Sequence, residues 1–369
     1  MGTKLRKIKF VLLNKQRSFF YRRFLRKRIK NLIKKIPSTY QRLNDDNYLK
    51  ECRYFLEKYF PGYKNTNWHY FYSTLNGIKD PRYIPEEIYF GYLDPLLNNY
   101  DYYLSYMDKF SFDLLIDNEY IPKTVMRITN NRFYDGTFSF MNFETAMNYL
   151  GNYKTELVIK PAINSGSGKN ITIDEAKNIV KLLREKQKYK SGSFVVQEAI
   201  RQHPLLAKFH PRSVNSLRIM TANLGEKTVV LSSYINFGRD NQRIDNGAAG
   251  GITCGIDKIG ALRKYAIDIA MNKYDKHPNS NLKFEGFKVP YFEKAVDFCI
   301  QQHKRFIRLT FISWDIAIGE NDEPIFIEMN FRRQAIYGHQ RLNGSLFGDY
   351  TDAVFQKYFY EKTKEPIYY

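Results

Sequence analysis

The chain has 369 residues, of which 43% are apolar and 16% aromatic, so it is not a disordered protein and can bury one large core or several modest ones. No stretch reaches the ~18 consecutive apolar residues of a membrane-spanning helix, and the N-terminus lacks the pattern of a secretory signal. Cys52, Cys254 and Cys299 are widely spaced and odd in number, which indicates a reducing compartment and neither a disulfide framework nor a zinc site. We therefore expect a cytoplasmic protein.

The net charge of +20 is concentrated at the N-terminus, where the first 35 residues hold fourteen Lys or Arg and no acidic residue. The remainder is only mildly basic, so we expect no nucleic-acid partner for the body of the protein. In this basic arm, residues 1–40, apolar residues recur at helical spacing: Tyr21, Leu25, Ile29, Leu32 and Ile36. The spacing predicts an amphipathic helix that ends at Pro37.

Two roles of the arm fit this pattern equally well. Residues 1–37 would lie on an anionic membrane surface, which would make the protein peripheral at the inner face of the plasma membrane. Alternatively, the helix packs on its own domain and leaves a solvated basic face. RNA binding is a weaker third interpretation.

The elements that follow are expected in three regions. Residues 41–105 form a mixed, aromatic-rich region with a helix over 46–60, followed by loop and short elements over 68–90. Residues 106–205 alternate strands and a helix, and residues 206–369 add further strands and a helix. The expected strands are 122–129, 155–161, 193–200, 214–224, 228–237, 311–319 and 324–331, and the expected helices are 173–189 and 291–307. This order predicts an α+β fold with antiparallel sheets.

The last two strands carry the strongest chemical signal. Alternation along each strand places Asp315 on one face of the first, and Glu328 and Asn330 together on one face of the second. If the strands pair through the turn at 319–324, these three side chains converge. Two carboxylates and an amide oxygen suit Mg²⁺, which takes one or two carboxylates and completes its shell with water and phosphate oxygens. The alternative is a hairpin with a polar, solvated face.

Two earlier segments are weaker candidates for nucleotide contacts. The strand at 155–161 contains Lys160, and a loop of small residues follows it: Ser165, Gly166, Ser167 and Gly168. Glycines let backbone N–H groups approach a phosphate, and a lysine supplies a point charge, although the spacing is not that of a Walker loop. The strand at 193–200 leads into Glu198, which is a candidate for holding adenosine or a solvated strand end.

Together with Met107, Asp108 and Lys109, these motifs resemble the ATP-grasp superfamily, and the order "MDK", "IKP…SGSG" and "E-x-N" is similar to the D-alanine–D-alanine ligases. The segments "NWHYFYSTLNGIKDPRYIPEEIYF", "SVNSLRIMT", "RIDNGAAGGI" and "IEMNF…GHQRLNGSLFGD" most resemble the sugar-transfer associated ATP-grasp family. The resemblance implies two α/β subdomains whose antiparallel sheets clasp ATP. The nucleotide-binding subdomain would be residues 106–205, and the catalytic, Mg²⁺-binding subdomain residues 206–369.

The resemblance also implies roles for individual residues. Lys109 and Lys160 would hold the α- and β-phosphates, and Glu198 the adenosine. The loop from Ser165 to Gly168 would cover the phosphates, and Asp315, Glu328 and Asn330 would hold Mg²⁺. Arg218 would stabilise the charge that develops during phosphoryl transfer. A second loop, with Asn246, Gly250 and Gly251, would lie over the γ-phosphate or the acyl phosphate.

The implied activity is that of an ATP- and Mg²⁺-dependent ligase in polysaccharide or capsule biosynthesis. A small-molecule or glycan-linked carboxylate would form an acyl phosphate, and an amine would then displace phosphate. One alternative is a phosphotransferase acting on a sugar or lipid-linked glycan, and another is a basic membrane- or nucleic-acid-binding module with an inactive ATP site. The stretch after Asn330 lacks the Pro-Gly of D-alanine ligases and contains Arg332 and Arg333, so the substrate stays open.

Overall fold

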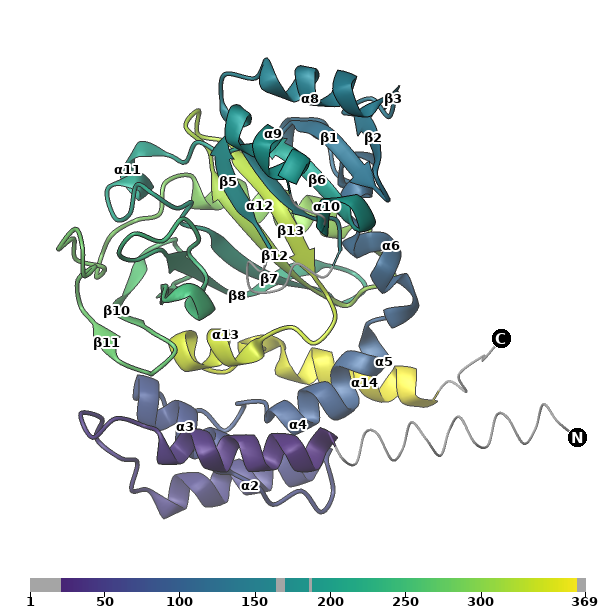
Figure 1. Ribbon diagram of the computed structural model, residues 1–369. Helices are drawn as coiled ribbons and strands as arrows, with labels where there is room; N and C mark the ends of the chain where they lie inside the picture. The colour runs from purple at the N-terminus through teal and green to yellow at the C-terminus, as the bar shows by residue number, and fades with distance from the viewer. Residues whose placement is uncertain (1–20, 164–169, 186–187, 364–369) are drawn as a thin grey trace, which may run out of the picture.

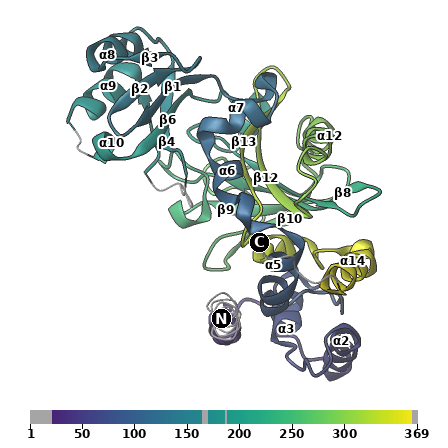
Figure 2. The ribbon, with the colours of Figure 1, turned by 90° about the vertical axis from the view of Figure 1, so that its right-hand side faces the viewer.

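The computed structural model describes residues 21–163, 170–185 and 188–363. Two antiparallel sheets organise this part of the chain, as the sequence predicts (Figure 1). In Figure 2 the smaller sheet and its helices form an upper body, the larger sheet lies in the middle, and the N-terminal helices lie below, beside α14 (Thr351–Thr363). None of the described helices combines the length and the apolar character needed to span a membrane.

The helices of residues 21–97 lie below the larger sheet, whereas those of residues 100–120 run up beside it (Figure 2). Residues 21–34 are helical. The elements that follow are α2 (Asp46–Tyr59), α3 (Asn67–Asn76), α4 (Glu86–Ile88), η1 (Tyr89–Leu93), α5 (Asp94–Leu97), η2 (Tyr100–Tyr102), α6 (Tyr103–Met107), η3 (Lys109–Ser111), α7 (Phe112–Leu115) and η4 (Asn118–Tyr120). The predicted helix over 46–60 is confirmed by α2, and the Asp45 side chain caps it by accepting a hydrogen bond from the Tyr48 backbone N–H.

The expectation of loop and short elements over 68–90 is wrong in its first part, because α3 is a continuous helix. Seven of its ten residues are buried, so the helix lacks the polar face that would reveal a helical period in the sequence. Gly77 ends it with a left-handed φ of 76°, a conformation that glycine adopts without steric cost.

The smaller sheet has the strand order β3-β2-β1-β6-β4-β5, with all neighbours antiparallel. Its strands are β1 (Thr124–Thr129), β2 (Arg132–Asp135), β3 (Phe140–Met141), β4 (Glu156–Pro161), β5 (Thr172–Glu175) and β6 (Ser193–Glu198). Its helices are α8 (Phe143–Gly151), α9 (Ala176–Glu185) and α10 (Lys188–Ser191). The helix predicted over 173–189 begins only at Ala176, because residues 172–175 pair with β4 as an edge strand.

The larger sheet has the order β11-β10-β9-β8-β7-β12-β13. Its strands are β7 (Leu217–Asn223), β8 (Thr228–Phe237), β9 (Ile252–Ile256), β10 (Leu262–Ile267), β11 (Lys273–Tyr274), β12 (Phe311–Ile318) and β13 (Pro324–Asn330). The elements that accompany it are α11 (Pro204–Ala207), η6 (Gly247–Ala249), α12 (Phe292–His303), α13 (Ile336–Asn343), η7 (Gly348–Tyr350) and α14. The strand predictions for β7, β8, β12 and β13 and the helix prediction for α12 are confirmed within a few residues at each end.

Two large apolar cores pack against the larger sheet. One contains Trp314 and Phe298 and also takes in Met107, Phe112 and Ile116, so the apolar residues of 106–121 pack with this sheet. The same segment also contacts the smaller sheet, where Asp113 pairs with Arg127 of β1. The other joins Met220 to apolar residues of α2 and α14. Because the N-terminal helices complete this second core, they are part of the body that carries the larger sheet.

The helix of residues 21–34 packs on its own domain, which is the second of the two roles considered for the basic arm. Leu25 is 2% exposed and Ile29 is fully buried. Ile29 shares a core with Trp68 and Phe71 of α3. The apolar stripe is therefore used inside the protein and is not presented to a partner. Residues 1–20, the rest of the arm, lie outside the described residues.

Candidate functional site

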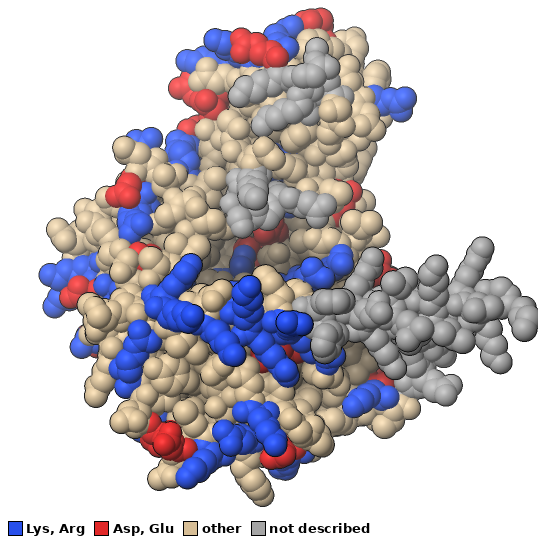
Figure 3. Space-filling model, turned by 60° about the horizontal axis from the view of Figure 1, so that its bottom comes forward, with Lys and Arg blue, Asp and Glu red and all other residues tan. Residues whose placement is uncertain are grey.

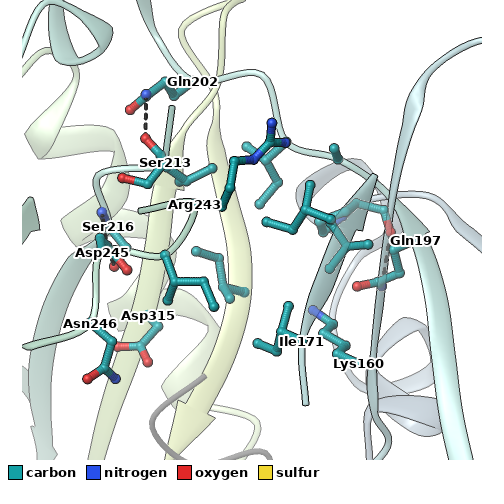
Figure 4. Close-up of a pocket in the computed structure, with 18 of the residues that line it drawn as sticks. Lys160, Ile171, Gln197, Gln202, Ser213, Ser216, Arg243, Asp245, Asn246 and Asp315 are labelled. Carbon is teal, nitrogen blue, oxygen red and sulfur yellow. Dashed lines mark hydrogen bonds between the residues drawn. The ribbon is translucent and has the colours of Figure 1, made fainter. Parts of the chain in front are cut away.

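A pocket of about 950 Å³ lies between the two sheets. Ligand pockets in proteins commonly measure about 300–1,000 Å³, so a nucleotide fits this volume. Figure 4 shows Lys160, Ile171 and Gln197 on the wall that belongs to the smaller sheet, facing Asp245 and Asp315 on the opposite side. The predicted site residues that line the pocket are Lys109, Lys160, Glu198, Arg218, Asn246, Asp315, Glu328 and Asn330.

The predicted metal-binding residues meet on one face of the hairpin β12–β13. Asp315 is directly opposite Glu328, and Ser313 is opposite Asn330. The Asn330 amide Nδ2 donates to Asp315 Oδ2 over 3.4 Å. A register shift between Asp315 and Ile316 leaves Ile327 as an extra residue on β13, and this bulge is what brings Asp315 to the same face as Glu328. The convergence inferred from the sequence is present in the structure.

Arg218 on β7 is held by the first of these carboxylates. Its Nε and Nη2 donate to the two oxygens of Asp315 over 2.6 and 2.5 Å. Nη1 approaches the Tyr234 hydroxyl at 3.4 Å. Burial raises the pKa of Asp315, and Arg218 opposes that shift. These two hydrogen bonds to Asp315 fix the plane of the Arg218 guanidinium. Because Arg218 lines the pocket, it can face a negative charge that develops there.

Two buried lysines reach the pocket from different elements. Lys109, in η3, is 3% exposed, and Lys160, in β4, is 7% exposed. Lys109 Nζ lies 3.3 Å from Glu328 Oε2. Burial lowers the pKa of Lys160 to about 7, and the neighbouring Lys109 charge adds to the effect. Two cations held this close, at a shared carboxylate, form a site whose positive charge an anionic ligand would stabilise.

Burial would raise the pKa of Glu328, but Lys109, Arg218 and Lys160 together lower it below its ordinary value. The carboxylate is therefore the ionised centre of a group of three cations. Because three cations stand beside the two carboxylates Asp315 and Glu328, the arrangement attracts an anion such as a metal–triphosphate complex.

The donor set fits Mg²⁺. Among the described residues no three His, Cys, Asp or Glu side chains are grouped to hold a metal, so an ion here would depend on Asp315, Glu328 and the amide of Asn330. Each carboxylate oxygen offers more than one lone pair, so the contacts of Asp315 with Arg218 and of Glu328 with Lys109 leave room for a metal. Such a site would complete its shell with water and phosphate oxygens.

Sequence reasoning missed Asp245, which lines the pocket directly before Asn246. Its Oδ2 accepts hydrogen bonds from the Ser216 backbone N–H over 2.8 Å and from the Ser216 hydroxyl over 2.5 Å. Burial raises the pKa of Asp245 to about 6. The carboxylate ties the loop of residues 238–251 to the start of β7. Its position in the "RIDNGAAGG" segment is the only sequence signal that could have pointed to it.

Sequence reasoning also missed an ion pair that joins the two walls. Arg243 Nη2 donates to both oxygens of Glu156 over 2.9 and 2.8 Å. Glu156 starts β4 in the smaller sheet, whereas Arg243 belongs to the loop after β8 in the larger one. Figure 4 shows Arg243 reaching across the pocket between its walls. Glu198, the predicted adenosine ligand, lines the same pocket and pairs with Lys123 at 3.4 Å.

Gly250 and Gly251 are in the expected loop but do not line the pocket that the described residues form. A Cβ on Gly251 would lie 2.1 Å from the Asp245 carbonyl oxygen, so this glycine is required for packing of the loop. Gly250 has a left-handed φ of 96°. The other predicted loop, Ser165, Gly166, Ser167 and Gly168, lies outside the described residues.

Gly251→Ala should lower the free energy of unfolding by about 1–3 kcal/mol, because a backbone carbonyl must move to admit the methyl group. The matched control is Gly247→Ala in the same loop, where a Cβ meets nothing within 4 Å and the change should stay within about 0.5 kcal/mol. Urea denaturation of both variants measures the difference. Equal stability of the two would contradict the packing role of Gly251.

Two antiparallel sheets with a pocket between them are the arrangement of the ATP-grasp fold, and comparison with known families identifies the family. The family model described as sugar-transfer associated ATP-grasp matches residues 92–353, and the chain therefore belongs to that family. No curated protein sequence matches the chain.

Several solved structures resemble the chain weakly. An N5-carboxyaminoimidazole ribonucleotide synthetase in complex with ADP is 11% identical, with a TM-score of 0.41 over 69% of this chain and 53% of that one. The biotin carboxylase domain of a 2-oxoglutarate carboxylase from Hydrogenobacter thermophilus, with MgADP and bicarbonate, is 11% identical, with a TM-score of 0.43 over 74% and 49%. The D-alanine–D-alanine ligase from Coxiella burnetii is 10% identical, with a TM-score of 0.40 over 72% and 61%. The chain thus spans about half to three-fifths of the length of these proteins.

Proposed function

We propose that the protein is an ATP- and Mg²⁺-dependent ligase that activates a carboxylate as an acyl phosphate and transfers the acyl group to an amine or another nucleophile. The supporting observation is the meeting of Lys109, Lys160 and Arg218 with Asp315 and Glu328 in one pocket. These residues come from distant parts of the chain, and together they supply the charges that a metal–triphosphate requires. Because ATP is available in the cytoplasm, we assign the reaction to that compartment.

Each side chain has a distinct role in this proposal. Lys109 and Lys160 bind phosphate oxygens from two sides, and an anionic ligand would relieve the burial cost of the Lys160 charge. Asp315, Glu328 and Asn330 would hold Mg²⁺, which neutralises phosphate charge and aligns the reacting oxygens. Arg218, held flat by Asp315, faces the transferred phosphoryl group.

The nucleoside half of ATP would occupy the other end of the pocket. There the lining comes from the end of β6, including Gln197 and Glu198, and from apolar side chains such as Ile173 and Ile327. Apolar side chains above and below a flat purine, with a few polar groups at its edge, are the usual composition of such a pocket. Arg243, which bridges to Glu156, would help to close it.

A carboxylated glycan unit is the class of substrate that we favour. Arg332 and Arg333 follow Asn330 directly, and both are exposed. Arg332 lies over the rings of Tyr100 and Tyr103, at 5.1 and 4.9 Å from their centroids, so its orientation is supported. Guanidinium groups bind carboxylates in a bidentate manner, which suits a uronic acid or another carboxylated glycan unit. A role in polysaccharide biosynthesis is consistent with the family.

Coupled product assays test the proposal. ADP and phosphate should be released in equal amounts only when a carboxylate such as a uronic acid and an amine are both supplied, and mass spectrometry should detect the amide. Glu328→Gln, which keeps the size of the side chain, is the control for contaminating ATPases and should remove the signal. A stable phosphorylated product that needs no amine would favour the phosphotransferase instead.

A further inference from the structure

The helix of residues 21–34 has a buried face and a charged face on opposite sides. At about 100° per residue, Leu25, Ile29 and Leu32 lie on one side of the axis, facing the core. On the opposite side, four cations follow one another along the helix: Arg23, Lys27, Lys30 and Lys34. All four are exposed. We call these four residues the basic ridge.

The helix is fixed to the protein by more than its apolar face. Arg28 forms an ion pair with Glu86, and Arg26 approaches Glu87 at 3.9 Å. Both glutamates are 1% exposed. Glu87 also accepts hydrogen bonds from Tyr63 and Trp68, each over 2.6 Å. The helix therefore cannot rotate freely, and the basic ridge keeps one orientation with respect to the pocket.

The ridge carries charge that the described protein does not neutralise. No ion pair or hydrogen bond joins the side chain of Arg23, Lys27, Lys30 or Lys34 to an acid in the described ranges, and the nearest acid along the sequence is Asp45. Figure 3 shows Lys and Arg side chains gathered on this face, below a hollow between the two bodies. A substrate that approaches the hollow from this side passes the ridge.

We infer that the basic ridge docks the protein on an anionic lipid bilayer, with the pocket mouth turned towards the membrane surface. The attraction is ionic, because the apolar stripe that an inserting helix would need is already buried in the core. Each cation near an anionic bilayer strengthens binding roughly fivefold, and the effect extends over about a Debye length. The exposed ring of Phe24, 59% accessible, lies next to the ridge and can add a contact at the headgroup level.

Vesicle co-sedimentation of the full chain tests this inference. The protein should sediment with vesicles of equal parts phosphatidylcholine and phosphatidylglycerol, but not with phosphatidylcholine alone, and added salt should release it. The quadruple variant Arg23→Gln, Lys27→Gln, Lys30→Gln and Lys34→Gln should bind the anionic vesicles at least about 100-fold more weakly. A matched variant removes four exposed lysines elsewhere, Lys177, Lys181, Lys258 and Lys304, and should bind as the wild type does.

Equal weakening in the two quadruple variants would overturn the inference, because net charge alone would then explain the binding. Unchanged binding of the ridge variant would also overturn it. A third contradicting outcome is ridge-dependent binding of a single-stranded RNA with no partition to vesicles. The inference is independent of the proposed reaction, since Glu328→Gln should bind vesicles normally even if no ligase activity is found.

Discussion

Replacing Arg218 by alanine should lower kcat by at least roughly 10³-fold, the scale found for arginines that stabilise a phosphoryl transition state. In this protein both oxygens of Asp315 hold the guanidinium in place. The same change leaves Asp315 buried without its partner, which should lower the free energy of unfolding by about 3 kcal/mol. Arg218→Lys should recover little activity, because an ammonium group cannot reproduce the bidentate contact.

A double variant separates the loss of activity from the loss of stability. Arg218→Met combined with Asp315→Asn removes both charges of the pair, so urea denaturation should show a stability close to that of the wild type. Its kcat should stay as low as that of Arg218→Ala. If Arg218→Ala retained a kcat within about tenfold of the wild type, the assigned role of the arginine would be wrong.

Replacing Lys160 by methionine should weaken ATP binding roughly 10- to 100-fold, because one charged hydrogen bond to phosphate is lost. Isothermal titration with ATP and Mg²⁺ measures this effect. Lys154→Met is the matched control, since Lys154 is exposed on the segment before β4 and should leave the affinity unchanged. An equal affinity of the two variants would exclude Lys160 from the nucleotide site.

The same substitution should stabilise the protein in the absence of nucleotide, and the effect should depend on pH. The pKa of Lys160 is lowered from 10.5 to about 7, so from pH 7 to 10.5 the unfolded chain binds a proton that the folded protein does not. The stability of the wild type therefore rises with pH across this interval, and the burial penalty is present in full below pH 7. Lys160→Met should be more stable by a few kcal/mol below pH 7, and the difference should vanish near pH 10.5.

Urea denaturation without nucleotide, at pH values below 7 and near 10.5, measures this trend. A constant difference between the two proteins would show that Lys160 does not carry a burial penalty. A variant that is more stable yet binds ATP poorly would identify Lys160 as a residue kept for binding at a cost in stability.

The sequence predicts the hairpin β12–β13 well because its signal is local. Alternation along β12 and β13 determines which side chains share a face, and the short turn between them determines that they pair. The strand pattern alone therefore groups Glu328 with Asn330, whereas Asp315 joins them through a register shift within the hairpin. The register shift after Asp315 could not be predicted, and it matters: in the register of the Ile316–Phe326 pair, Asp315 would lie opposite Ile327 and on the other face from Glu328.

Other parts of the site depend on contacts between segments that are distant in the sequence, so no local sequence pattern indicates them. The Arg243–Glu156 pair joins residues 87 positions apart, and Asp245 reaches Ser216 from another element. Among the helices, α3 has no polar face, because neighbours from other parts of the chain cover it on most sides. In these cases the tertiary structure determines the role of a residue, and a single sequence does not contain that information.

The basic arm is a further case in which the sequence predicts an element but not the surface that the element contacts. Its apolar spacing correctly predicts a helix, but spacing alone does not say whether the apolar face meets a membrane or a protein core. The burial of Leu25 and Ile29 answers that question for residues 21–34. The structure also fixes the direction of the basic ridge on the opposite face. The membrane hypothesis can therefore name the four residues that would contact the lipid.

A crystal structure with Mg²⁺ and a non-hydrolysable ATP analogue would show whether the nucleotide binds between the two sheets. We expect phosphate oxygens within hydrogen-bond distance of Lys109 and Lys160, and a metal about 2.0–2.1 Å from oxygens of Asp315 and Glu328. The analogue bound outside this pocket, or a metal coordinated by neither carboxylate, would contradict it.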